Sequence, residues 1–164
     1  MLKNHTLLKQ KTCQHVTMKT RLGMIDVNPE HIYTFEEGLY GFSEAKSFVI
    51  VPMPGIDDVT PFLLMQSLDD EQLCFVLLNS NLDYGSTVTN VPSLLLQQDI
   101  EQVALALNID IHDIAFSFLV SFQQEGDAKM TINTMAPLFF SLEQKLAWQV
   151  LLNNPIYNVK ETIG

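Results

Sequence analysis

The sequence is poor in cysteine and has no long apolar run, and each shortage excludes a class of protein. Its 164 residues include only two cysteines, Cys13 and Cys74, so it is not a disulfide-stapled secreted domain. No apolar stretch approaches the roughly 20 residues of a membrane-spanning helix or forms the core of a signal peptide. We therefore expect a protein of the reducing cytoplasm with no membrane partner.

Basic residues are also scarce, and they are unevenly distributed. Nine Lys and Arg oppose 19 Asp and Glu, for a formal net charge of −10. Residues 1–25 contain five of the bases and no acid, so residues 26–164 carry four bases and 19 acids, a net charge of −15. An acidic surface repels phosphate backbones and other copies of itself but attracts basic proteins. We expect no direct nucleic-acid binding, a monomer when free, and a basic protein partner.

Glycine and proline together contribute only 14 residues, and 47% of the chain is hydrophobic, which is typical of one folded domain. Residues 1–17 lack helix or strand periodicity and are predicted to be a disordered, dispensable extension. Residues 18–164 are predicted to form a single mostly β domain, an antiparallel sheet curled into a small barrel or sandwich with one or two short helices. The expected strands are residues 24–27, 32–35, 48–51, 62–65, 73–78, 116–122, 130–135, 138–140 and 147–152.

Two of these elements have the most regular patterns. Within residues 116–122 the apolar side chains at even positions share one strand face, and Ser117 and Ser121 share the other. A helix is predicted near residues 99–108, where Asp99 and Gln102 have the spacing of a capping box and Asn108 can end the helix in the left-handed conformation. Apolar residues with helical spacing occupy this segment: Ile100, Val103, Ala104 and Leu107.

The sequence contains no catalytic motif that we can identify. Its four histidines lack the i, i+4 spacing of a zinc protease, and it has neither a nucleophile elbow nor a phosphate-binding loop. His112 with Asp110 and Asp113 is the best metal-like cluster, but a solvated turn explains it better. Adjacent acids, in pairs at 36–37 and 57–58 and in a run of three at 69–71, lack the ligand spacing of a calcium loop. We expect neither an enzyme nor a cofactor or metal, and we interpret the acids as solvated charges that can contact a basic partner.

Three blocks, in order, resemble the family of bacterial flagellar assembly factors called FliW. Residues 33–42, followed by 46–49, are similar to the family signature F-x-x-G-L-P-G-F, with Tyr40 where the family has proline. Residues 61–70 are similar to its P-F-x-x-L-Q-S-L-D-D block. Residues 130–137, then 149–151 and Tyr157, are similar to its M-T-x-N-L-x-A-P, Q-V-V-L and terminal tyrosine. The resemblance covers about residues 18–157.

This resemblance implies a non-enzymatic, partner-switching protein. Members of the family bind flagellin in the cytoplasm and, alternatively, the RNA-binding carbon storage regulator CsrA, whose repression of flagellin translation they relieve. Two alternatives stay open: a generic cytosolic secretion chaperone with other clients, and a small-molecule-binding or hydrolytic β-barrel that uses the acidic loop pairs. The candidate protein-interface residues are Glu36, Glu37, Leu39, Tyr40, Phe42, Gln66, Asp69, Asp70, Glu71 and Asn133.

The turn from Gln66 to Glu71 gives a sharper expectation. Asp69, Asp70 and Glu71 place three like charges side by side, which is mildly unfavourable for folding. We expect all three to face a basic partner, so that neutralising them together would leave thermal stability unchanged or slightly raised while slowing association.

Overall fold

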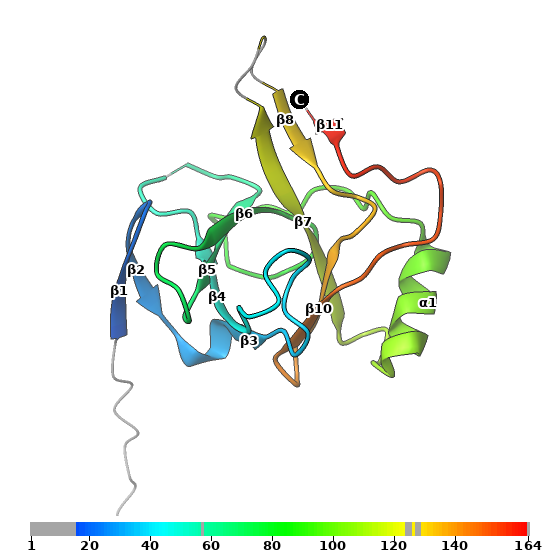
Figure 1. Cartoon of the computed structure of the whole chain (residues 1–164), viewed down its shortest axis with the longest axis horizontal. Helices are drawn as coiled ribbons and strands as arrows, with labels where there is room; N and C mark the ends of the chain where they lie inside the picture. Colours follow the sequence, from blue (N-terminus) through cyan, green and yellow to red (C-terminus); the bar gives the residue numbers. More distant parts are fainter. Residues whose placement is uncertain (1–15, 57, 124–125, 127–128, 164) are drawn as a thin grey trace, which may run out of the picture.

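The computed structural model describes residues 16–56, 58–123, 126 and 129–163, and its fold is mostly β, as predicted (Figure 1). The short helices are η1 (Pro29–His31) and α1 (Gln97–Leu107). The strands are β1 (Val16–Thr20), β2 (Gly23–Val27), β3 (Ile32–Thr34), β4 (Ser47–Pro52), β5 (Phe62–Ser67), β6 (Cys74–Asn79), β7 (Ile114–Gln123), β8 (Lys129–Ile132), β9 (Leu138–Ser141), β10 (Leu146–Gln149) and β11 (Glu161–Ile163). None of the helices within these ranges is long and apolar enough to cross a membrane.

Seven strands close into a barrel, so of the two predicted architectures the barrel is confirmed and the sandwich is wrong. Their order is β7-β6-β5-β4-β3-β10-β9, and the pairing of β7 with β9 completes the circle. Neighbours are antiparallel except β3 and β10, which are parallel with Thr34 opposite Leu146. Strand β7 is long enough to pair with β9 and β6 through its first half and with β8 through its second, so β8 and β11 extend beyond the barrel (Figure 1).

The barrel interior is filled by side chains, as in other small barrels. Phe35 packs edge-on against Phe48 and Phe140, with ring centroids 5.4 and 6.1 Å apart. Ala115 of β7 belongs to this interior cluster, and Ser117, two residues on, is fully buried. Ser117 and Ser121 lie on the same face of β7, as predicted. Their exposure differs, because the closed barrel buries Ser117 while Ser121 lies beyond the barrel and is exposed.

Two further layers cover the outside of the barrel. The β1–β2 hairpin packs on β4 and β5 through Ile25, Val49 and Leu64. Helix α1 packs against β7 and β9, because Ile100 and Val103 lie in one cluster with Phe116 of β7 and Phe139 of β9. Consequently both faces of β4, β5 and β7 are buried over much of their length.

Several predicted boundaries differ from the structure. The predicted strands 130–135 and 147–152 end earlier, at Ile132 and Gln149, and β11 was not predicted. Strand β1 begins at Val16 and pairs with Val27, two residues before the expected start of the domain, while residues 1–15 lie outside the described residues. Helix α1 begins at Gln97 with Leu96 as an extended N-cap that makes no side-chain capping bond, so the expected capping box at Asp99 is wrong. The predicted left-handed end at Asn108 is confirmed, with φ of 55°.

Candidate functional site

The loop between β3 and β4 carries the first family-like block, and its shape depends on Gly38. This residue has φ of +67°, and a Cβ there would lie 2.7 Å from the Cα and carbonyl oxygen of Ser43. Glycine alone fits such a position. Past it, Leu39 and Phe42 exchange backbone hydrogen bonds of 3.3 and 2.8 Å, which places Tyr40 at the tip with 63% of its surface exposed.

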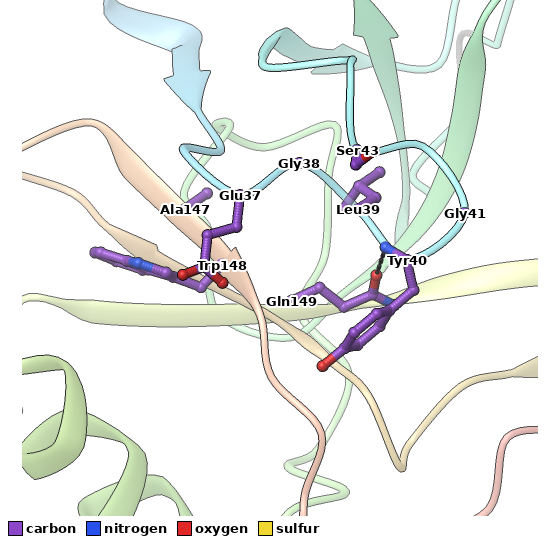
Figure 2. Close-up of a pocket in the computed structure, with 9 residues that line it drawn as sticks. All are labelled: Glu37, Gly38, Leu39, Tyr40, Gly41, Ser43, Ala147, Trp148 and Gln149. Carbon is purple, nitrogen blue, oxygen red and sulfur yellow. Dashed lines mark hydrogen bonds between the residues drawn. The ribbon is translucent and has the colours of Figure 1, made fainter.

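A glutamine side chain fixes this loop to strand β10 (Figure 2). The backbone N–H of Tyr40 donates to Oε1 of Gln149 over 2.9 Å, and Nε2 of Gln149 donates to the Ala136 carbonyl over 3.2 Å. The Ala136 N–H in turn donates to Oδ1 of Asn133 over 2.8 Å. Hydrogen bonds of Asn133, Ala136 and Gln149 therefore connect the third family-like block to the loop that carries the first.

A hollow of about 200 Å³ opens where the loop meets β10 (Figure 2). Glu37, Tyr40, Trp148 and Gln149 contribute the polar and aromatic parts of its lining. The lining is completed by Gly38, Leu39, Gly41, Ser43 and Ala147. A carboxylate and two aromatic rings around one hollow can hold a cationic group.

The turn between β5 and β6 is built around a buried glutamine. Gln66 is fully buried, and its Nε2 donates to the carbonyls of Ser67, Glu71 and Leu73 over 3.0, 3.2 and 3.1 Å. The backbone N–H groups of Asp69 and Asp70 donate to Oγ of Ser67. Gln66 thus shapes the turn from inside and does not present its side chain to a partner.

Asp69 ties this turn to the loop. Its Oδ2 accepts the backbone N–H groups of Lys46 and Ser47 over 2.9 and 3.0 Å, and these bonds lower the pKa of the carboxyl group. Nζ of Lys46 donates to the Glu36 carbonyl over 2.7 Å. The ring of Phe42 packs edge-on against Phe75 of β6, with centroids 5.3 Å apart. Loop and turn are therefore one contiguous surface, which we call the acidic end: Glu36, Glu37, Asp69, Asp70 and Glu71.

The predicted interface residues divide into three groups. Exposed side chains that can meet a partner belong to Glu36, Glu37, Tyr40, Phe42, Asp70 and Glu71. Leu39 and Gln66 are buried, and Asn133 is half-buried and holds a turn. Asp69 is exposed, but its carboxylate is occupied by two backbone donors. Sequence reasoning missed Trp148 and the roles of Lys46 and Gln149, although the last two stand within the family-like blocks.

The acids of the metal-like cluster at residues 110–113 accept hydrogen bonds within their own turn and from the end of β9 and the turn between β9 and β10. Oδ1 of Asp110 accepts the N–H of His112 over 2.8 Å, and the carboxylate of Asp113 accepts from Oγ of Ser141 and the N–H of Glu143. Within the ranges that the structure describes, no group of three or more His, Cys, Asp or Glu side chains is arranged to hold a metal ion. Of the acid pair at 57–58, Asp57 lies outside those ranges.

Comparison with known proteins supports the three-block resemblance. The family model described as FliW protein matches residues 16–163. The flagellar assembly factor FliW of Bacillus subtilis is 29% identical over 87% of this chain and 92% of its own length. The protein of the same name from Bacillus licheniformis is 30% identical, with the same coverage of each chain.

A solved structure agrees in fold. The crystal structure of the flagellar assembly factor FliW superposes with a TM-score of 0.62, at 24% identity, and covers 90% of this chain and 96% of the other. These relatives are named as flagellar assembly factors. The chain therefore belongs to the FliW family of flagellar assembly factors.

Proposed function

We propose that this chain is a cytoplasmic monomer that binds flagellin and, alternatively, the RNA-binding regulator CsrA. Binding to CsrA would relieve repression of flagellin translation without this chain touching RNA. Free flagellin would displace the regulator and return the system to repression. The family membership of residues 16–163 supports this assignment.

The observation that carries the proposal is the acidic end. Two family-like blocks meet there through Asp69, and a third is joined to the loop through Gln149. The structural bonds of Asp69 leave Asp70 and Glu71 exposed beside it. A protein that binds RNA phosphates must present basic groups, so this surface suits CsrA in charge.

The test is the salt dependence of association. Purified chain is mixed with CsrA or with flagellin, and association rates are measured at about 50 and 300 mM salt. The double variant Asp70→Asn, Glu71→Gln should bind CsrA several-fold more slowly at low salt, and the difference should shrink at high salt because exposed charges are screened. The matched control is Glu101→Gln, Glu143→Gln, which removes the same charge from α1 and from the turn between β9 and β10.

Each outcome decides something. A larger effect of the 70/71 pair than of the 101/143 pair supports docking of CsrA at the acidic end. Equal effects would show only general attraction by net charge. If the wild-type chain binds neither flagellin nor CsrA, the proposed function is wrong, and recovery of another secreted client would favour the general chaperone.

A further inference from the structure

We propose that the hollow between Glu37, Tyr40 and Trp148 receives an arginine side chain from a protein partner. This inference rests on the proposed function, which requires a basic partner, and it names the contact that such a partner would make. It also assigns a role to Tyr40 and Trp148. These uncharged side chains contribute nothing to the electrostatic attraction between the acidic end and a basic partner.

The walls of the hollow suit a guanidinium group. Figure 2 shows the Glu37 carboxylate beside Trp148 and the Tyr40 ring on the side of Gln149, all lining the same hollow. A carboxylate forms charge-assisted hydrogen bonds with a guanidinium, and the faces of tyrosine and tryptophan attract cations. Arginine suits this combination better than lysine, because its planar group can stack on a ring while its N–H groups bond a carboxylate.

The hollow is formed before any partner arrives. Both ends of the Gln149 amide are engaged, Oε1 with the Tyr40 N–H and Nε2 with the Ala136 carbonyl. The Leu39–Phe42 bridge and the left-handed Gly38 fix the loop that carries Glu37 and Tyr40. A rigid site loses little conformational entropy when it binds, so a single side chain can add measurable affinity.

The chain's own bases do not satisfy Glu37 in the part of the molecule that the structure describes. Lys46 belongs to the same loop, but its Nζ donates to the carbonyl oxygen of Glu36. No hydrogen bond between described residues involves the Glu37 carboxylate. Both Glu37 and Tyr40 are exposed, so an incoming side chain can reach them.

The sequence supplies a direct probe, because Trp148 is the single tryptophan of the chain. We would titrate the full chain with L-argininamide and follow tryptophan fluorescence. The matched ligand is citrullinamide, which keeps the α-amino group but replaces the charged guanidinium with a neutral urea group of the same shape. The expected result is a saturable change with argininamide that is absent with citrullinamide. Lysinamide should bind more weakly, because an ammonium group cannot stack on a ring.

Variants separate the two parts of the site. Glu37→Gln should weaken argininamide binding up to about fivefold, the range of an exposed ion pair. Tyr40→Leu should weaken it about two- to fivefold, and Tyr40→Phe should retain most of the affinity because the ring remains. Glu44→Gln is the control, since this exposed acid lies in the same loop but does not line the hollow.

Several outcomes would overturn the inference. Equal binding of citrullinamide, or no effect of Glu37→Gln beyond that of Glu44→Gln, would remove the charged contact, and equal binding of lysinamide would remove the preference for arginine. Association with flagellin and CsrA is measured on the same variants. If the wild-type chain binds a partner but not argininamide, this inference fails and the proposed function stands. If argininamide binds but neither partner does, the proposed function fails instead.

Discussion

Two regions of the molecule use a carboxylate to join segments that are distant in sequence, and they differ in burial. At the start of α1, Asp99 accepts the hydroxyl of Tyr157 over 2.5 Å and Nδ2 of Asn154 over 3.3 Å, while the Tyr157 oxygen accepts the N–H of Leu96. We call this set, Leu96, Asp99, Asn154 and Tyr157, the helix clasp. At the acidic end, Asp69 accepts two backbone N–H groups in the same manner.

Because they differ in burial, one region contributes mainly to the stability of the fold and the other leaves side chains accessible to a partner. Tyr157 is only 3% exposed, and burial, followed by the hydrogen bond to Asp99, raises the pKa of its hydroxyl. Removing a buried partner leaves polar groups unsatisfied and opens a cavity, which is costly. Asp69 lies in water, so its bonds contribute less, but the loop it fixes leaves acids and aromatic rings accessible. The helix clasp therefore stabilises the fold, and the acidic end presents a surface.

The largest effect is expected from breaking the helix clasp. Tyr157→Ala should lower the free energy of unfolding by about 3–5 kcal/mol, because a buried ring is lost. Tyr157→Phe should cost about 1–2 kcal/mol, because the Leu96 N–H loses its acceptor and Asp99 loses a donor. Urea unfolding measures both. If Tyr157→Phe unfolds like the wild-type chain, the hydroxyl bonds contribute nothing and only packing holds the C-terminal segment.

A backbone change at the acidic end should come next. Gly38→Ala should cost about 2–3 kcal/mol, because alanine there is strained at positive φ and its Cβ would collide with the Ser43 backbone. Gly41→Ala is the control: it has φ of +84° but open space around the added Cβ, so strain alone should cost about 1 kcal/mol. If thermal unfolding shows the same loss of stability for Gly38→Ala and Gly41→Ala, the loop moves enough to relieve the collision with Ser43.

A smaller effect is expected at Asp69, and it corrects the prediction that the three turn acids are equivalent. Asp69→Asn should cost about 0.5–1 kcal/mol at neutral pH, since an exposed carboxylate with two backbone donors is weakened by solvent. The control Asp70→Asn, Glu71→Gln should change stability little. The three-residue change is therefore expected to lower stability and not to leave it unchanged.

The pH dependence of Asp69 has a definite sign. Its pKa is lower in the folded chain than the ordinary 3.8, so its contribution is present above that value and is lost as the pH falls through the folded-state pKa. Melting temperatures of wild type and Asp69→Asn should therefore converge as the pH falls below about 3.8. Parallel curves would show that the two backbone bonds do not depend on the charge.

His31, with intermediate burial, should give the smallest effect. It packs on Tyr84 with ring centroids 4.7 Å apart, and burial, then the charge of Lys145, lowers its pKa. The neutral ring is therefore favoured in the folded chain, and stability should fall as the pH drops below the ordinary value of 6.5 toward the folded-state pKa. His31→Gln should flatten the melting temperature between about pH 7.5 and 5.5. An unchanged slope would assign the dependence to other groups.

The sequence by itself determined the elements whose signals are local. Strand alternation in residues 116–122 identified β7, and Asn108 marked the end of α1, because side-chain periodicity and left-handed backbone depend on neighbouring residues alone. Gly38 and Gly41 marked a shaped loop for the same reason, since only glycine enters positive φ without strain. The order of the three family-like blocks identified the family from the residues alone.

Only the tertiary structure decided which polar residues hold the fold and which are free to bind. Gln66 and Asp70 are both polar residues of one turn, yet Gln66 lies inside it and Asp70 faces water. The acid Asp99 caps no helix start but receives Tyr157 from 58 residues away, and Tyr40 meets Gln149 from 109 residues away. Such partners come together only when the barrel closes, and the burial that closure creates sets the strength of each bond, which no local pattern records.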